Sequence, residues 1–193
     1  EDTFESNPRL MVIEALMFAV IAIIGALLTY ELAGPKRAVP AASAISVPGM
    51  LEAETLPVIE KAGDFMTMTQ DTSTFAQGQW SGGKHLFAAT RSRGDTLTMK
   101  LPAGSAGGYD LRAYLTKSFD YGIVQISVNG ANAGSPIDLW SYVVESTGPV
   151  HLGRVTLQGD GDVVRIEVVG KNERAVAPFY QFGLDGFVLE PAP

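Results

Sequence analysis

The sequence predicts a mainly β protein, an antiparallel β-sandwich of the jelly-roll type preceded by one transmembrane α-helix. Three observations lead to this fold class: an apolar run near the N-terminus, a proline- and alanine-rich stretch after it, and alternating apolar and polar residues from Leu51 onward. They divide the chain into a tail over 1–9, a helix over 10–32, a linker over 33–50 and a β domain over 51–193.

The apolar run extends from Leu10 to Leu32, and Glu14 and Glu31 are its only charged residues. A helix of this length rises about 34 Å at about 1.5 Å per residue, enough to cross a hydrocarbon core of about 30 Å. Small residues spaced i, i+4 offer a close-packing face to a neighbouring helix. They are Ala15, Ala19, Ala22 and Ala26. We therefore expect a single-pass protein in contact with membrane lipid and with other membrane-protein subunits.

Other interpretations of this run agree less well with its residues. The apolar core is too long for a cleaved signal peptide. The run resembles the N-terminal helix of type IV pilins, but Arg9 replaces the small residue that pilin processing requires. Glu14 either reaches the lipid headgroups or contacts a partner subunit. The run contains no histidine, so we expect its helix to bind no pigment or haem.

The linker contains Pro35, Pro40 and Pro48. Proline fixes φ and removes a hydrogen-bond donor, which predicts a semi-rigid tether of up to about 50 Å at about 3.1 Å per residue. Lys36 and Arg37 follow the apolar run, whereas only Arg9 precedes it. This small excess of positive charge favours a cytoplasmic β domain.

The β domain is predicted from residues that alternate with a period of two. The clearest stretches are 96–100, 109–115, 124–128 and 164–168. Each has one apolar and one polar face, which is typical of a half-buried strand. Glycine-rich turns separate them, among them Ser81-Gly82-Gly83, Asn129-Gly130 and Gly159-Asp160-Gly161-Asp162. About nine or ten short strands without a helical pattern favour a sandwich or jelly roll.

Composition restricts the chemistry. The formal net charge of −7 has the wrong sign for a nucleic-acid-binding protein. Without cysteine there are no disulfides and no thiolate metal sites. His85 and His151 belong to no metal-binding or nucleophile motif, so we expect surface or half-buried histidines and no enzymatic activity.

Segments at both ends of the β domain carry a family resemblance. Leu51-Glu-Ala-Glu54 and Gly183-Leu-Asp-Gly-Phe-Val-Leu-Glu190 resemble the first and last strands of the galactose-binding-like β-sandwich in bacterial carbohydrate-binding modules. Three interior segments resemble a subgroup of these modules. They are Gln79–Lys84, Leu115–Gln125 and Pro136–Leu139. The resemblance covers about 50–191 and implies a periplasmic β domain.

The resemblance also implies a structural calcium ion. In related modules, carboxylates of the first strand and an acidic residue of the last strand commonly hold it, which here would be Glu52 or Glu54 and Asp185. Terminal antiparallel strands bring such oxygen ligands together for a hard cation. Alternation places Glu52 and Glu54 on one face of the strand. In the alternative to calcium binding, one of these carboxylates pairs with a lysine or an arginine.

Glycan binding would need exposed aromatic rings with polar groups beside them. The candidates are Trp80, Tyr121 and Trp140, with Asp120, Gln125 and Asp138 near them in sequence. The alternative is that these rings fill the core between the two sheets, as most aromatic residues in a sandwich of this size do.

Two functions follow. The first is a non-catalytic accessory subunit of a larger bacterial membrane complex, with a photosynthetic reaction-centre–light-harvesting supercomplex as the candidate host. The second is a membrane-anchored carbohydrate-binding module of the cell envelope. Both place the protein in the bacterial inner membrane, and a hydrolase is disfavoured because no catalytic constellation is present.

Overall fold

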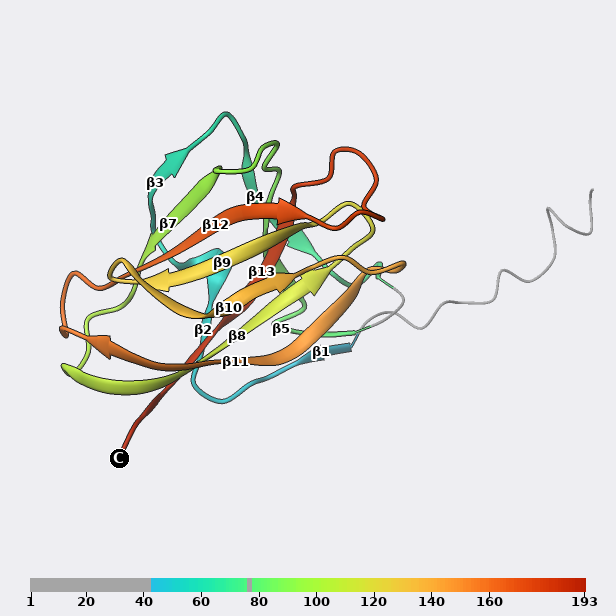
Figure 1. Cartoon of the computed structure of the whole chain (residues 1–193). Helices are drawn as coiled ribbons and strands as arrows, with labels where there is room; N and C mark the ends of the chain where they lie inside the picture. The colour runs from blue at the N-terminus through green and yellow to red at the C-terminus, as the bar shows by residue number, and fades with distance from the viewer. Residues whose placement is uncertain (1–42, 76–77) are drawn as a thin grey trace, which may run out of the picture. The chain divides into compact units, whose positions relative to one another are not determined.

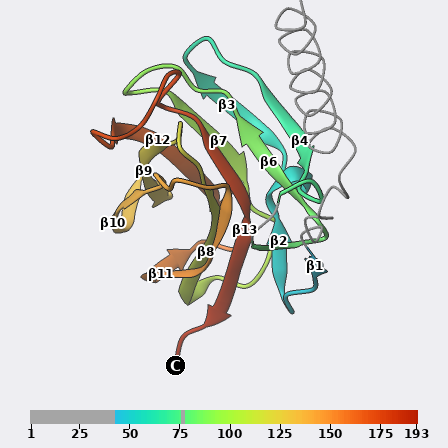
Figure 2. The ribbon, with the colours of Figure 1, turned by 90° about the vertical axis from the view of Figure 1, so that its right-hand side faces the viewer.

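The computed structural model describes residues 43–75 and 78–193, which form two antiparallel β-sheets packed face to face and a separate two-stranded parallel sheet (Figures 1 and 2). This confirms the predicted mainly β sandwich. Within these two ranges no helix is both long enough and apolar enough to cross a bilayer. The predicted tail, the span at Leu10–Leu32 with its alanine face, and the linker up to residue 42 lie outside the described residues.

The described residues form thirteen strands and one short 3-10 helix, more strands than predicted because several are only three residues long. They are β1 (Ser43–Ile45), β2 (Met50–Glu52), η1 (Ala53–Thr55), β3 (Val58–Ala62), β4 (Thr67–Asp71), β5 (Gln79–Ser81), β6 (Lys84–Ala88), β7 (Thr96–Lys100), β8 (Gly107–Lys117), β9 (Gly122–Val128), β10 (Ala131–Asp138), β11 (Glu145–Leu157), β12 (Val163–Lys171) and β13 (Phe182–Pro191).

One sheet has the strand order β10-β9-β12-β7-β3, and the other has the order β11-β8-β13-β6-β4, with β2 also paired to β13. Apolar side chains from both sheets form a single core cluster, including Leu97 and Ile126 from the first sheet and Leu115, Leu184 and Phe187 from the second. The inner faces of the two sheets therefore bury each other, as in other β-sandwiches.

The predicted alternation holds in the central strands. In β9 every second residue is buried, beginning at Gly122, and in β12 the side chains of Val164, Ile166 and Val168 face the core. Strand β7 differs, because Thr96 and Thr98 are buried as well as its apolar residues. The prediction of one polar, solvent-exposed face is wrong for β7, which lies between β12 and β3.

The turn between β9 and β10 follows the predicted chemistry. Asn129 and Gly130 have φ angles of 51° and 81°, the left-handed conformation that a two-residue hairpin of type I′ requires. The Asn129 amide donates to Asp162 Oδ1 at 2.6 Å, and its oxygen accepts from the backbone N–H of Val163 at 3.0 Å. This side chain therefore fixes the hairpin to the start of β12.

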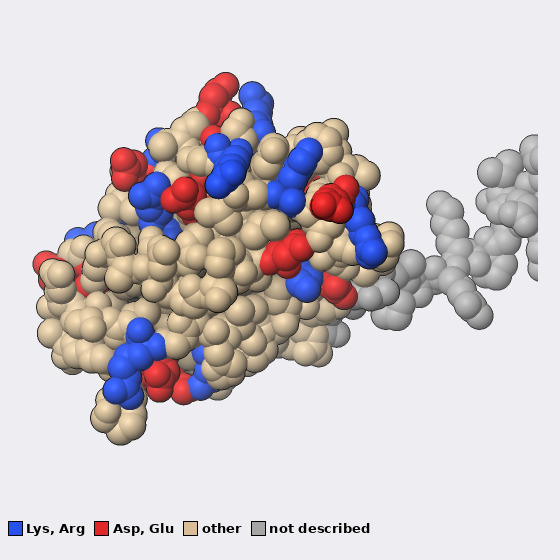
Figure 3. All heavy atoms as spheres, viewed as in Figure 1, with Lys and Arg blue, Asp and Glu red and all other residues tan. Residues whose placement is uncertain are grey.

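The last part of the predicted linker is folded onto the sandwich. Residues 43–45 form β1, which pairs with β5 in parallel, Ala44 lying opposite Trp80. A turn over 47–50, with Gly49 at φ 74° and a hydrogen bond from Met50 N to Val47 O, then leads into β2. Backbone pairing thus includes residues 43–45 of the predicted linker in the fold. In the view of Figure 3, basic and acidic side chains are interspersed along the upper part of the domain.

Candidate functional site

Three connections meet at the end of the sandwich toward which β8 and β12 run (Figure 1). They are the β8–β9 turn over 118–121, the β10–β11 loop over 139–144 and the β12–β13 loop over 172–181. The backbone N–H of Ser141 donates to Ser118 O at 3.1 Å, and that of Val176 donates to Phe119 O at 3.0 Å. These bonds hold both loops against the turn, and we call this end the three-loop end.

A pocket of about 170 Å³ opens at the three-loop end. It is lined by Gln70, Phe75, Phe87, Ser118, Phe119, Asp120, Tyr121, Val144 and Gln181. Aromatic rings thus lie beside amide and carboxylate groups. This combination of apolar surface and a few polar groups is typical of a small-molecule site, although the volume is below the usual range of about 300–1,000 Å³.

The polar groups of this pocket come from different elements. Asp120 accepts a hydrogen bond from the Ser118 hydroxyl at 2.7 Å, and Gln70 Oε1 lies 2.8 Å from Nε2 of His85. Phe119 is the most exposed ring of the pocket, at 46%. The sequence analysis missed Phe119 and Gln70, because only the fold brings β4 and the β8–β9 turn together.

Two of the three predicted aromatic candidates are not exposed. Trp80 is completely buried, and its indole Nε1 donates to Thr116 Oγ1 at 2.8 Å. Tyr121 is 4% exposed, and burial raises the pKa of its phenol. Trp80 therefore cannot form an exposed platform, because its side chain is buried and bonded to Thr116 of β8. Tyr121 lines the pocket with little exposed surface.

Trp140, the third candidate, is half-buried at the three-loop end. Its ring meets that of Tyr142 edge-on at 4.5 Å between centroids, and the Arg174 guanidinium lies 5.4 Å from the Trp140 ring. Tyr142 is 76% exposed. Trp140 thus supports a more exposed aromatic ring, which the sequence analysis did not single out.

The polar neighbours predicted for this region lie at different places. Asp138 accepts from the Asn172 amide at 2.6 Å and joins two of the three loops. Gln125 instead bonds to carbonyl groups of Ile126 and Ala133 within the β9–β10 hairpin. The structure therefore brings Asp120 and Asp138 to the three-loop end and assigns Gln125 a structural contact.

The three acidic residues predicted to hold calcium form a cluster around Ser81. The Ser81 backbone N–H lies 3.1 Å from both carboxylate oxygens of Asp185, and its hydroxyl donates to Glu52 Oε1 at 2.5 Å. Glu54 follows in the 3-10 helix rather than in a strand. Oε2 of Glu52 and Oε2 of Glu54 are buried without a hydrogen-bond partner in the described part of the chain.

The electrostatics of this cluster are unfavourable for three bare carboxylates. The pKa of Asp185 is raised to about 7, chiefly by burial and in smaller part by the charges of Glu52 and Glu54, while the hydrogen bond from the Ser81 N–H opposes the rise. Burial likewise raises the pKa of Glu54. Unpaired buried carboxylate oxygens are costly, and a bound cation removes that cost.

As they stand, no three His, Asp or Glu side chains within 43–75 and 78–193 are placed so that they could hold a metal ion. The donor set nevertheless fits a hard cation, because calcium takes six to eight oxygen ligands from carboxylates, carbonyls and water. Two buried oxygens here have no other partner. Closing the site would require Glu52 and Glu54 to turn toward Asp185.

His85 is not the surface or half-buried residue that the sequence suggested. It is fully buried, and burial lowers its pKa to about 4. Its Nδ1 lies 2.6 Å from Thr116 Oγ1. His151, by contrast, is an exposed residue of β11. Both faces of β6 are buried at this point, since Leu86 next to His85 is buried as well.

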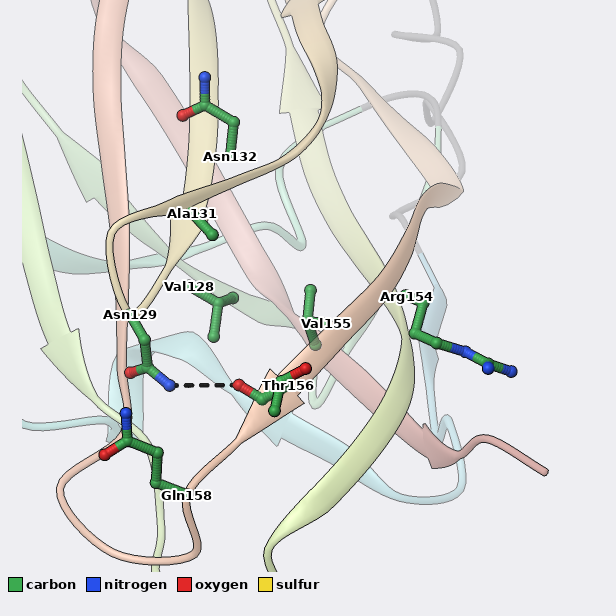
Figure 4. Close-up of a pocket in the computed structure, with 8 residues that line it drawn as sticks. All are labelled: Val128, Asn129, Ala131, Asn132, Arg154, Val155, Thr156 and Gln158. Carbon is green, nitrogen blue, oxygen red and sulfur yellow. Dashed lines mark hydrogen bonds between the residues drawn. The ribbon is translucent and has the colours of Figure 1, made fainter.

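A second hollow, of about 310 Å³, lies between the β9–β10 hairpin and β11 (Figure 4). The Asn129 amide donates to Thr156 O at 3.3 Å across this hollow. The same amide also donates to Asp162 and so holds the hairpin turn in place. The eight residues that line this hollow include no aromatic ring, and Figure 4 shows Arg154 pointing away from it. The three-loop end is therefore the better candidate for a ligand site.

No protein-family model matches this chain, and no curated protein matches it. Among solved structures, a xanthan lyase from Paenibacillus is 27% identical over 78% of this chain, with a TM-score of 0.60. A GH26-CBM35 β-(1,4)-mannanase from Podospora anserina is 18% identical over 75% of this chain and 27% of its own, with a TM-score of 0.46. A CBM35 from Paenibacillus barcinonensis is 14% identical over 74% of this chain and 98% of its own, with a TM-score of 0.42.

This chain spans 14% of the length of the xanthan lyase. The match establishes that the β-sandwich described here is also found as one part of a much larger protein. It agrees in fold with the resemblance found in the sequence. It agrees better with a carbohydrate-related module than with a subunit of a photosynthetic complex.

Proposed function

We propose that residues 43–193 form a non-catalytic module that binds a polysaccharide at the three-loop end. The observation that carries this proposal is the pocket itself, in which the rings of Phe87 and Phe119 lie beside Gln70, Asp120 and Gln181. Sugar rings offer apolar faces to aromatic side chains and hydroxyl groups to amides and carboxylates. The 27% identity to a part of a xanthan lyase supports a polysaccharide as the ligand class.

The pair of half-buried Trp140 and exposed Tyr142 extends this site. A pocket of about 170 Å³ would hold one unit of the chain, and the Tyr142 ring offers a second apolar surface on the neighbouring loop. Arg174, over the Trp140 ring, adds a donor at the same end. The proposed module therefore binds one unit in the pocket and contacts the rest of the chain through Tyr142.

The proposal is tested by affinity electrophoresis in gels that contain xanthan, β-(1,4)-mannan or β-(1,3)-galactan. We expect retardation by at least one of them, lost in Phe119→Ala and weakened in Tyr142→Ala. Ile59→Ala is the matched control, because Ile59 is a 54% exposed apolar residue of β3 outside the pocket. Retardation that Phe119→Ala leaves unchanged would place the site elsewhere, and no retardation by any polysaccharide would refute the function.

We also propose that Glu52, Glu54 and Asp185 hold a structural calcium ion that stabilises the fold and takes no part in chemistry. The two unpartnered buried oxygens and the desolvated Asp185 support this assignment. Isothermal titration of the chelator-treated protein with Ca²⁺ tests it. An absence of binding heat together with a melting temperature that EDTA does not change would contradict it.

The anchor completes the proposal. A helix over 10–32 would hold the module on the bacterial inner membrane, with the β domain in the periplasm. Protease added to sealed, oriented vesicles tests this placement, because a periplasmic domain is cleaved only from the outer side of right-side-out vesicles. Cleavage only after lysis would reverse the orientation, and recovery of the full-length protein in the soluble fraction would refute the anchor.

A further inference from the structure

Four side chains form a continuous hydrogen-bonded chain from the core to the pocket at the three-loop end. Trp80 Nε1 lies 2.8 Å from Thr116 Oγ1, which lies 2.6 Å from His85 Nδ1, and His85 Nε2 lies 2.8 Å from Gln70 Oε1. Trp80, Thr116 and His85 are completely buried, while Gln70 is half-buried and lines the pocket. We call these four residues the relay.

The direction of each hydrogen bond in the relay follows from its first member. An indole N–H can only donate, so Thr116 Oγ1 accepts from Trp80. The described residues offer the Thr116 hydroxyl proton one acceptor, His85 Nδ1. The opposite arrangement, with the proton on Nδ1, would leave that hydroxyl proton unpaired in a buried site. Nδ1 of His85 is therefore unprotonated, and the neutral ring carries its proton on Nε2.

The proton on Nε2 of His85 then fixes the side-chain amide of Gln70. It must be met by an acceptor, so the Gln70 oxygen faces His85 and the Gln70 NH₂ group is left for the pocket. In the described part of the chain this NH₂ group has no hydrogen-bond partner. The side-chain amide of an unrestrained glutamine can rotate and present either its NH₂ group or its oxygen to a ligand. The relay holds the Gln70 oxygen against His85, so only the NH₂ group can face the pocket.

The surroundings hold the His85 ring in this place. A Cβ atom at Gly183 would lie 2.7 Å from Cε1 and 2.8 Å from Nδ1 of His85, so only glycine leaves room for the ring there. Phe75 lies over the other side, 6.1 Å between ring centroids. Burial, which lowers the pKa of His85 to about 4, keeps the ring neutral at ordinary pH. The relay is therefore rigid as well as directional.

We propose that the relay makes Gln70 an obligatory hydrogen-bond donor in the pocket, so that the pocket selects a sugar oxygen that can accept at that position. This inference rests on the proposed polysaccharide site. Asp120 lines the same pocket and can only accept when ionised, so a ligand that offers an acceptor to Gln70 can also donate a hydroxyl proton to Asp120. Trp80, Thr116 and His85 are positioning residues, and Gln70 is the residue that contacts the ligand.

The first test reads the tautomer of His85 directly. Imidazole ¹⁵N spectra of the wild-type domain at pH 7 should show His85 protonated on Nε2 alone. Thr116→Ser keeps the hydroxyl and should give the same spectrum. Thr116→Val removes the proton donor to Nδ1 and should change the tautomer. A wild-type His85 protonated on Nδ1, or on both nitrogens, would overturn the inference.

The second test measures binding of the polysaccharide that retards the wild-type protein, by titration calorimetry. Gln70→Glu keeps the shape of the side chain and the contact with His85 but replaces the donor by an acceptor, so we expect binding at least about tenfold weaker. Gln158→Glu, which adds the same charge at the hollow of Figure 4, should bind as the wild type does.

The outcomes separate this inference from the proposed function. Binding that Phe119→Ala abolishes and Gln70→Glu leaves unchanged would overturn the donor role of Gln70 while the glycan site stands. A domain that binds no polysaccharide would overturn both. Equal loss in Gln70→Glu and Gln158→Glu would show an effect of charge alone and would also overturn the donor role.

Discussion

The backbone N–H of Ser81 lies 3.1 Å from both carboxylate oxygens of Asp185, although 104 positions separate the two residues. The Ser81 hydroxyl reaches Glu52 from the same point. Strand β5 thus joins the last strand of the domain to its N-terminal segment. Removing negative charge from this cluster, or neutralising it with a cation, should change the stability of the whole sandwich.

We predict that calcium decides whether the wild type or Asp185→Asn is the more stable protein. In a chelator at pH 8 the buried Asp185 charge destabilises the wild type by an amount on the order of 4 kcal/mol, since its pKa is raised from 3.8 to about 7. Asp185→Asn removes this charge and can still accept from Ser81, so it should unfold at a higher urea concentration than the wild type.

With Ca²⁺ in excess the order should invert, because only the wild type gains the binding energy of the ion. Asp160→Asn serves as the control, since Asp160 is an exposed turn residue. A wild type that is more stable than Asp185→Asn in the chelator would contradict the assignment of a strained acidic cluster.

We predict opposite pH dependences from His85 and Asp185 in the absence of cations. The pKa of His85 falls from 6.5 to about 4 on folding, so the unfolded chain binds more protons between these values and stability rises with pH from 4 to 6.5. The pKa of Asp185 rises from 3.8 to about 7, so its contribution decreases as pH rises through that range.

In the wild type these two contributions should largely cancel between pH 4 and 6.5. In Asp185→Asn only that of His85 remains, so the free energy of unfolding measured with urea in EDTA should rise from pH 4 to 6.5 and level off above. A fall in stability of Asp185→Asn over the same range would show that another group dominates.

We predict that the two tryptophans differ in their effect on folding. Trp80→Phe removes a buried donor to Thr116 and leaves the relay without its first member, which should cost about 1–3 kcal/mol of stability. Trp140→Phe, at the half-buried three-loop end, should cost less than about 1 kcal/mol. Urea unfolding of both variants measures this difference, and equal costs would contradict the distinction between core and loop positions.

We predict that Gly186→Ala detaches β2 from β13. A Cβ atom at Gly186 would lie 2.5 Å from the carbonyl oxygen of Leu51, which is too close for any side chain. Hydrogen exchange should rise in 50–52, and the cluster at Ser81 should lose calcium affinity. Gly104→Ala is the matched control, because nothing lies within 4 Å of a Cβ atom there. Unchanged exchange in Gly186→Ala would refute the prediction.

The strands were predictable because local pattern and burial agree. The alternation in 124–128 and 164–168 reports which side of each strand faces the other sheet, and Asn129-Gly130 allows only a tight hairpin. The cluster of Glu52, Glu54 and Asp185 followed from a family resemblance, and the structure joins Glu52 and Asp185 through Ser81, which no spacing indicated.

The pocket was not predictable in the same way. Phe119 and Gln70 come from segments that only the sheet topology brings together, so no local period marks them. Trp80 and Tyr121 were named because aromatic residues bind sugars, but the same rings also fill cores, and composition does not distinguish the two. The burial of His85 depends on the absence of a side chain at Gly183, nearly a hundred positions away.

The parallel pairing of β1 with β5 limits how far the domain can travel from whatever holds its N-terminus. Residues 43–50 belong to the folded body, so ten residues, 33–42, separate it from the end of the predicted membrane helix. At no more than about 3.6 Å per residue, ten residues span at most about 36 Å. Under the proposed membrane anchor and glycan site, the domain would reach only polymer close to the bilayer, and more distant polymer would have to diffuse to it.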